Sequence, residues 1–112
     1  MKYMLLIYGN DEEWDNRSEE EQNAIFAEYM ALAERPDVVV SHQLQPAATA
    51  TTVRVEGTGA LTTDGPFVET KEELGGYYIV EADNLDGAID FAAQIPAART
   101  GGAVEIRPLV ER

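Results

Sequence analysis

The sequence predicts an α+β domain of the ferredoxin-like type, βαββαβ, with one further β-hairpin inserted before its third main strand. Three observations lead to this class. Residues 3–8 and residues 77–80 are apolar at successive positions, which is typical of strands buried on both faces. Two longer segments carry apolar residues at helical spacing. The elements alternate as strand, helix, strand, hairpin, strand, helix and strand, and 112 residues fit a single domain over residues 1–112.

An acidic segment joins the first strand to the first helix. Gly9 and Asn10 end the strand at residues 3–8. Residues 11–21 hold seven acids and one arginine, and we expect a solvated loop and a helix start there. Ser18 and Glu21 form a capping box at the start of the helix. The apolar residues of this helix are Ile25, Phe26, Tyr29, Met30, Leu32 and Ala33, and it ends at Pro36 or Asp37.

The next elements are a second strand and a hairpin. Residues 38–40 (VVV) begin the strand, which reaches about Leu44 before Pro46 closes it. Residues 50–56 (ATTVRVE) alternate between polar and apolar side chains. The Gly57-Thr58-Gly59 turn then leads into residues 60–63, and this arrangement predicts a hairpin.

The last third of the chain predicts a strand, a helix and a strand. Residues 77–82 (YYIVEA) form the third main strand. Asn84 or Asp83 caps a helix that Pro96 ends, with Leu85, Ala88, Ile89, Ala92 and Ile95 as its apolar residues. The final strand, residues 103–109 (AVEIRPL), has Val104 and Ile106 on one side and Glu105 and Arg107 on the other.

The predicted fold leaves one face of its sheet uncovered, because two helices cover only the other face. About six large apolar side chains, drawn from residues 3–8, 38–40 and 77–80, would be exposed. Each forgoes roughly 1.5–3 kcal/mol of burial. The sum is on the order of 10 kcal/mol, comparable to the stability of a small domain. We therefore expect a homodimer through the sheet face, closed into a dimeric α/β barrel.

Composition excludes several classes of partner and cofactor. A net charge of −13 repels phosphate backbones and anionic lipid, so neither nucleic acid nor membrane is an expected partner. The chain has no cysteine, one histidine and no glycine-rich phosphate loop, and we expect no metal and no cofactor. The apolar run near the N-terminus is too short for a signal or a membrane span, so we expect a cytoplasmic protein.

One segment is more specific than folding alone requires. It runs from Thr63 to Glu72 (TDGPFVETKE) and continues into Leu74-Gly75-Gly76-Tyr77-Tyr78. With residues 44–46 (LQP), 50–54 (ATTVR), Ile95-Pro96 and 104–108 (VEIRP), it resembles the DGPF branch of the YCII-related superfamily over nearly the whole chain.

The resemblance implies a ferredoxin-like fold and a dimeric α/β barrel, and for many members a gene placed beside an extracytoplasmic-function sigma factor. A sister branch carries a proposed catalytic dyad of a histidine in the first helix and an aspartate after the second. This sequence has no histidine in its first helix, and its second helix ends Gln94-Ile95-Pro96. We therefore do not expect this chain to use the dyad mechanism of the sister branch.

Asp64 leads the candidates for chemistry. It either bonds its own backbone within an Asp-Gly turn or presents a carboxylate at the mouth of the barrel. Beside the apolar Phe67, which would contact a substrate, such a carboxylate would be partly desolvated and suited to act as a general base. Lys71 either belongs to an exposed ion-pair cluster with Glu69 and Glu72 or holds an anionic substrate.

Further candidates lie on the strands. His42, the only histidine, is either a surface or interface side chain or an acid–base group, since imidazole changes charge near neutral pH. Arg107 shares one face of the last strand with Glu105, as a barrel-lining ion pair that binds substrate or as a polar edge. Tyr77 and Tyr78 are expected to pack in the core or the dimer. We also considered Trp14, in the acidic segment, as a lid over the barrel mouth.

Two functions from different classes fit these features. The first is a cofactor-independent enzyme that transfers a proton on a small organic acid or ring compound, as in isomerisation or elimination. In it Asp64 is the base, and Lys71 or Arg107 binds the anion. The second is a regulatory or ligand-binding module associated with a sigma factor. A barrel lined with polar groups favours the enzyme, and one filled with tyrosine and valine favours the module.

Overall fold

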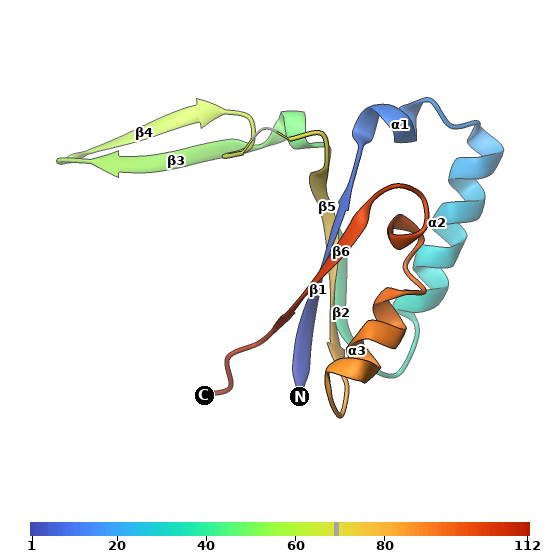
Figure 1. Cartoon of the computed structure of the whole chain (residues 1–112). Coiled ribbons are helices and arrows are strands. Elements are labelled where there is room, and N and C mark those ends of the chain that lie inside the picture. Colours follow the sequence, from blue (N-terminus) through green and yellow to red (C-terminus); the bar gives the residue numbers. More distant parts are fainter. Residues whose placement is uncertain (69) are drawn as a thin grey trace.

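A four-stranded antiparallel sheet, in the order β2-β5-β1-β6, forms the body of the molecule (Figure 1). We describe residues 1–68 and 70–112 of a computed structural model. The sheet strands are β1 (Lys2–Gly9), β2 (Val38–Gln43), β5 (Glu73–Glu81) and β6 (Ala103–Pro108), and the separate hairpin consists of β3 (Thr51–Glu56) and β4 (Gly59–Asp64). The helices are α1 (Asp11–Asp15), α2 (Glu19–Ala33) and α3 (Leu85–Ala92), with 3₁₀ turns at Ala47–Thr49 and Pro96–Ala98. The predicted α+β class, with a four-stranded antiparallel sheet plus a hairpin, is confirmed.

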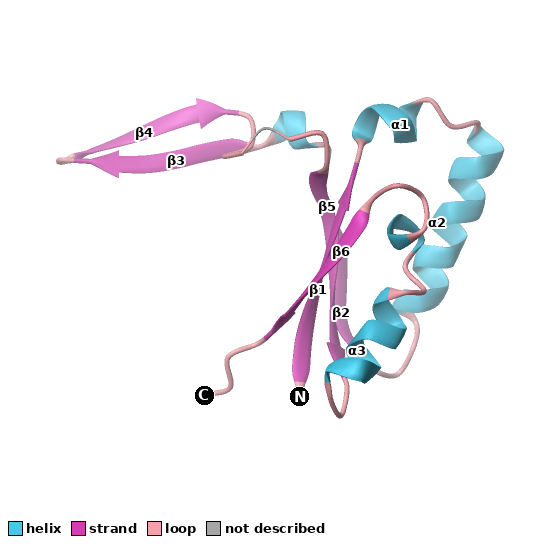
Figure 2. Ribbon diagram, in the orientation of Figure 1, coloured by secondary structure: helices cyan, strands magenta, loops and turns pink. Residues whose placement is uncertain are grey.

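The core lies between one face of the sheet and the helices α2 and α3. The central strands β1 and β5 are paired so that Tyr3 lies opposite Val80, and Leu5 lies opposite Tyr78. All four side chains are buried against the helical layer. Phe91 of α3 packs its ring edge on to the Tyr78 ring, with the ring centroids 5.5 Å apart. Figure 2 shows that the helices α1, α2 and α3 lie on this side of the sheet.

The predicted helix starts are confirmed by their caps. The Ser18 hydroxyl accepts a hydrogen bond of 3.1 Å from the Glu21 backbone N–H. The Asn84 side chain accepts one of 3.1 Å from the Gly87 N–H. Each cap satisfies a donor that the first turn of a helix leaves unpaired.

Some predicted boundaries were wrong. The segment after β1 is not only a loop, because the Asn10 side chain caps the short helix α1 by accepting from the Glu13 N–H at 3.1 Å. Helix α3 ends at Ala92, and Ile95 lies beyond it, fully buried at the start of the 3₁₀ turn that Pro96 enters. Strand β2 ends at Gln43, in agreement with the predicted end at about Leu44.

The start of β5 was also predicted too late. The strand begins at Glu73 and not at Tyr77, because Gly76 pairs with Ile7 across the sheet. The predicted strand, residues 77–82, left out the two glycines before Tyr77. Inside a ladder, however, backbone hydrogen bonds hold a glycine in a strand despite its low intrinsic preference for one.

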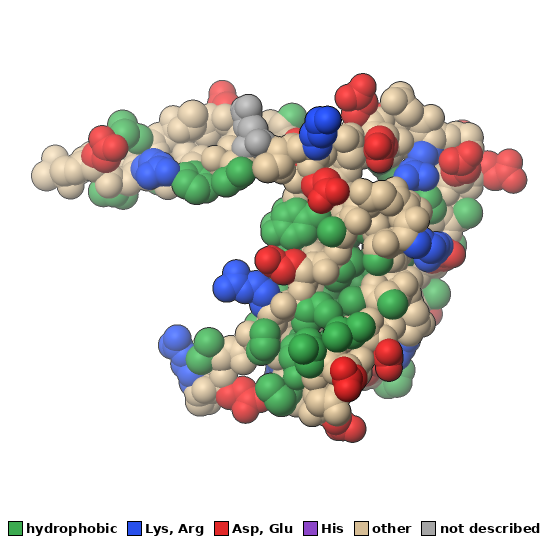
Figure 3. Space-filling view, viewed as in Figure 1, with side chains coloured by type: hydrophobic (Ala, Val, Ile, Leu, Met, Phe, Trp, Pro, Cys, Tyr) green, Lys and Arg blue, Asp and Glu red, His purple; other side chains and the backbone are tan. Residues whose placement is uncertain are grey.

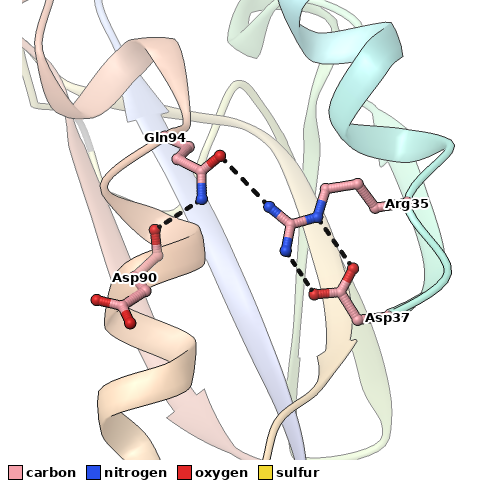
Figure 4. A network of polar contacts seen from close by, with 4 residues as sticks. All are labelled: Arg35, Asp37, Asp90 and Gln94. Carbon is pink, nitrogen blue, oxygen red and sulfur yellow. Dashed lines mark hydrogen bonds and ion pairs between the residues drawn. The ribbon is translucent and has the colours of Figure 1, made fainter.

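An ion pair at the end of α2 ties the helical layer together (Figure 4). The Arg35 guanidinium donates to both oxygens of the Asp37 carboxylate at 3.2 and 3.0 Å, and to the Gln94 side chain at 3.4 Å. Gln94 in turn donates to the backbone oxygen of Asp90 in α3. Arg35 also lies over the Phe91 ring, 4.7 Å from its centroid. The turn after α2 is thereby held against α3.

The opposite face of the sheet, which we call the open face, carries no helix in the described chain. The strand register places six large apolar side chains on it, each half-buried: Met4, Leu6, Tyr8, Val40, Tyr77 and Ile79. The β3–β4 hairpin, which we call the arm, projects on this same side, away from the helices (Figure 1). In Figure 3 the arm stands clear of the body, and the space between the two is unfilled. Of the helices in residues 1–68 and 70–112, none has the length and apolar character needed to span a membrane.

Candidate functional site

A cleft of about 570 Å³ lies between the helices α1 and α2 and the ends of strands β1, β2 and β5. The two helices stand over this end of the sheet in Figure 2. Five aromatic residues line it: Trp14 from α1, Phe26 and Tyr29 from α2, and Tyr77 and Tyr78 from β5. Binding sites for small molecules are typically apolar hollows of 300–1,000 Å³ with a few polar groups, and this cleft is of that size and kind.

Two adjacent glycines of the sheet lie in the lining of the cleft. Gly75 and Gly76 of β5 both line it. Gly76 is buried, and a Cβ atom there would lie 2.9 Å from the backbone oxygen of His42 on β2, closer than a side chain allows. Glycine at this position therefore keeps β2 and β5 close together beneath the cleft. The Gly-Gly pair of the Leu74-to-Tyr78 motif is thus part of the cleft lining.

Two tyrosines that line the cleft are held in place by hydrogen bonds to the backbone. The Tyr78 hydroxyl donates a hydrogen bond of 2.8 Å to the backbone oxygen of Tyr29. The Tyr29 hydroxyl accepts one of 3.2 Å from the backbone N–H of Ala97. Burial raises the pKa of Tyr78 to about 12 and also raises that of Tyr29. Both phenols are thus uncharged near neutral pH and are available only as neutral hydrogen-bonding groups.

Two carboxyl groups meet at the cleft. Asp11 starts α1, just beyond the end of β1, and Glu73 starts β5, directly opposite Gly9 in the ladder. Their side chains are hydrogen-bonded to each other, and this bond, with burial and the repulsion of Asp11, raises the pKa of Glu73. Asp11 Oδ2 accepts a hydrogen bond of 3.3 Å from the backbone N–H of Ala47. A neighbouring carboxylate disfavours the charged form of Glu73, which is why the pKa of Glu73 is raised.

His42 and Tyr77 form a second polar pair in the residues that line the cleft. They lie opposite each other on β2 and β5, with His42 Nδ1 2.9 Å from the Tyr77 hydroxyl. Depending on the imidazole tautomer, the hydroxyl donates to Nδ1 or the Nδ1–H donates to the hydroxyl oxygen. The strand register directs both side chains toward the open face, so this pair lies where the cleft meets that face.

The remaining residues predicted from sequence lie outside the cleft. Asp64 is the exposed last residue of β4, and the exposed Phe67 follows it, with the Arg54 guanidinium 4.6 Å from its ring centroid. Lys71 lines a separate shallow depression with Tyr8, Thr70 and Glu72. Arg107 and Glu105 are exposed on the open face, opposite Met4 and Leu6 of β1. The structure therefore does not bring Asp64, Lys71 and Arg107 together within one chain.

Two further sequence predictions concerned Glu69 and Trp14. Glu69, predicted to belong to the Lys71 cluster, lies outside the described residues. Trp14, considered as a lid over a barrel mouth, instead belongs to the wall of the cleft on the helical side. Within residues 1–68 and 70–112 there is no group of three or more His, Asp or Glu side chains placed to hold a metal ion.

Sequence reasoning missed the Asp11–Glu73 pair and the Tyr29 hydroxyl. A signal for the pair was present. The predicted topology makes β1 and β5 antiparallel neighbours, so residues just after β1 must lie beside residues just before β5. Asp11 was instead assigned to a solvated acidic run, and the late predicted start of β5 hid Glu73. Tyr29 had no such signal, because an apolar helix stripe does not indicate which ring borders a cavity.

Comparisons with known proteins bear on this geometry. The YCII-related domain family matches residues 1–112. An uncharacterised protein of Rhizobium meliloti (strain 1021) is 32% identical over 114 residues, covering 97% of this chain and 92% of that protein. A solved structure matches with a TM-score of 0.57 and 16% identity, over 100% of this chain and 96% of the other. It is the 5-chloro-2-hydroxyhydroquinone dehydrochlorinase of Burkholderia phenoliruptrix AC1100 in complex with 2,5-dihydroxybenzoquinone. At this identity, the structural match concerns the fold.

Proposed function

This chain belongs to the YCII-related domain family, and we propose that it is a cofactor-independent enzyme that binds a ring compound in its cleft and transfers a proton there. The observation that carries the proposal is the Asp11–Glu73 pair at an aromatic-walled cleft. The aromatic walls suit a planar ring. The dehydrochlorinase with the same fold acts on a ring compound, which supports the same substrate class here.

The paired carboxyl groups suit an acid–base step. A carboxyl group accepts a proton when it is ionised and donates one when it is protonated, and this pair places two such groups side by side. It can take a proton from a ring carbon and return it elsewhere, which is an isomerisation, or keep it while a leaving group departs, which is an elimination. The raised pKa of Glu73 brings it closer to working pH, where proton transfer by a carboxyl group is most effective.

Hydrogen exchange tests this function directly. We expect the protein in D₂O to speed the replacement of ring-attached or ring-adjacent C–H protons in at least one member of a panel of cyclic ketones and hydroxylated benzenes. Proton NMR measures this as loss of signal. Glu73→Gln keeps the shape and removes the acid–base group, so the acceleration should disappear. Glu81→Gln, at the exposed far end of the same strand, is the matched control and should retain it.

The exchange experiment also has a contrary outcome. A panel member that binds in the cleft but exchanges no faster than it does without protein would exclude proton transfer on that ligand. If every bound member behaved so, the chain would be a binding module and not an enzyme.

His42 is a second candidate acid–base group, favoured by its hydrogen bond to Tyr77 at the edge of the cleft. When His42 Nδ1–H donates to the Tyr77 hydroxyl oxygen, Nε2 is free to accept a proton, and the hydrogen bond holds the ring in place. His42→Gln in the same exchange assay separates the two groups. If the carboxyl pair alone carries the chemistry, exchange continues in this variant. If His42 takes part, exchange falls as it does in Glu73→Gln.

We further infer that a second copy of the chain covers the open face and forms a dimeric α/β barrel. Six half-buried apolar side chains lie there, and ten of the 21 acidic residues lie in the helices α1, α2 and α3 on the other side. On a chain of net charge −13, two open faces can therefore approach with less repulsion than two helical faces. A second copy would also meet the arm, because the arm projects on the same side.

A further inference from the structure

The Tyr29 hydroxyl is placed to donate a hydrogen bond into the cleft. A phenol has one donor hydrogen and two acceptor lone pairs. In Tyr29 one lone pair is used by the Ala97 N–H at 3.2 Å, and the hydroxyl hydrogen has no acceptor within residues 1–68 and 70–112. The ring lines the cleft and is half-buried. A ligand oxygen in the cleft would supply the missing acceptor.

The position of this hydroxyl is fixed by the surrounding backbone. Ala97 is buried in the 3₁₀ turn Pro96–Ala98, and its N–H orients the Tyr29 oxygen. The backbone of Tyr29 is held in turn by the Tyr78 hydroxyl at 2.8 Å. A donor that is already held in place gains more from each bond to a ligand, because little side-chain entropy is lost on binding. Burial also raises the pKa of Tyr29, so its proton is retained near neutral pH.

The charges around the cleft narrow the ligand class further. The charged side chains that line it are one arginine, Arg17, and four acids, Asp11, Glu13, Asp15 and Glu73. An anionic ligand would meet this negative field and be disfavoured. The lining therefore favours an uncharged ring over the small organic acid that the sequence left open.

We propose that Tyr29 donates a hydrogen bond to a carbonyl oxygen on an uncharged ring, which makes cyclic and aryl ketones and their enols the substrate class of this cleft. This inference rests on the proposed function. Removal of a proton beside a carbonyl places negative charge on its oxygen, and a fixed donor aimed at that oxygen stabilises the charge. Tyr29 would then donate a hydrogen bond to the carbonyl oxygen while Glu73 removes the proton from the carbon beside the carbonyl.

Two ligands of similar shape test this assignment. Acetophenone offers a carbonyl acceptor, and ethylbenzene does not. Their affinities are measured by the fluorescence of Trp14, the only tryptophan in the chain, which lines the cleft. We expect Tyr29→Phe to lower the affinity for acetophenone by about 2- to 10-fold relative to the affinity for ethylbenzene, which is the effect of losing one hydrogen bond. Tyr3→Phe removes a buried hydroxyl that donates to the Met1 sulfur, outside the cleft, and should leave the ratio unchanged.

Each outcome decides between the two proposals. An unchanged ratio in Tyr29→Phe, with both ligands still bound, overturns the role of Tyr29 and leaves the cleft intact as a ring site. Failure of both ligands to bind the wild-type protein overturns the ring site and this inference with it.

A measurement on the wild-type protein covers the case in which Tyr29→Phe does not fold. The infrared carbonyl stretch of bound acetophenone should stay near its hydrogen-bonded frequency in water. A shift to the frequency recorded in hexane would overturn the proposed hydrogen bond.

Discussion

The carboxyl group of Asp11 lies beside that of Glu73 at the cleft and raises the pKa of Glu73, although one residue follows the first strand and the other begins the fifth. The antiparallel pairing of β1 with β5 brings them together, since Gly9 lies directly opposite Glu73. Folding therefore places two like charges side by side. The raised pKa of Glu73 is the direct consequence of this pairing.

The pair predicts an unusual dependence of stability on pH. The folded protein holds the Glu73 proton above its ordinary pKa of 4.5, so the folded state binds more protons than the unfolded state there. This contribution to stability is present below that pKa and is lost as the pH rises through the folded-state pKa. Glu73→Gln cannot ionise, so at about pH 7 it should be as stable as wild type or more stable, with the difference vanishing near about pH 4.

Urea unfolding at fixed protein concentration measures this difference, with Glu81→Gln as the control that should show no such pH dependence. A Glu73→Gln variant less stable than wild type by more than about 1 kcal/mol at neutral pH would contradict the repulsion between the carboxyl groups.

The two glycines of β5 should respond differently to the same substitution. In Gly76→Ala the new Cβ would lie 2.9 Å from the His42 oxygen, so β2 and β5 must separate, at about 1–3 kcal/mol. In Gly75→Ala the nearest atom is the Ile7 oxygen at 4.0 Å, and the change should cost about 1 kcal/mol or less. Thermal unfolding of both variants checks this. Equal losses would mean that Gly76 does not set the spacing beneath the cleft.

The open face predicts that the chain is a dimer in solution. Ile79 lies near the middle of this face, opposite Met4 and Val40, and Ile79→Glu would place two charges in the interface. Light scattering with size exclusion at micromolar concentration should find a wild-type dimer and an Ile79→Glu monomer. Ile89→Glu changes an exposed residue of α3 in the same way and should stay dimeric. A monomeric wild type would rule out both the dimer and the barrel.

Asp64 stays a predicted functional residue. Its side chain is exposed on the arm, so Asp64→Asn and Asp64→Ala should each change stability by no more than about 0.5 kcal/mol. Loss of hydrogen exchange in these stable variants would assign chemistry to the arm, acting on a cleft of its own or of a second subunit. Urea unfolding that shows both variants weakened by more than about 1 kcal/mol would instead make Asp64 part of the scaffold.

The fold followed from local signals that are strong in this chain. The caps at Ser18 and Asn84 determine where α2 and α3 start, and the doubly apolar strands identify β1 and β5 as central. Helix α1 was missed because one turn capped by Asn10 carries no apolar stripe. The end of α3 was placed too late because Ile95 is buried by the turn after the helix and not by the helix.

The candidate site was less predictable, because the strand spacing and register beneath the cleft do not show in the periodicity of the sequence. Gly76 matters through the side chain it lacks, which no periodicity reveals. His42 and Tyr77 were both noticed, but their hydrogen bond depends on the register of β2 against β5. The bulge between Val38 and Val40 sets that register, and strand composition alone does not place it.

Nuclear magnetic resonance of ¹⁵N-labelled protein tests the central claim, that a ring compound binds in the cleft. The single tryptophan gives one indole N–H signal, from Trp14 in the cleft wall, and Gly76 reports from its floor. During a titration with acetophenone, both signals should shift and saturate together, while the amides of Gly57 and Gly59 at the tip of the arm stay unchanged. Saturable shifts confined to Asp64, Gly65 and Phe67, with Trp14 and Gly76 unmoved, would contradict the account and place the binding site on the arm.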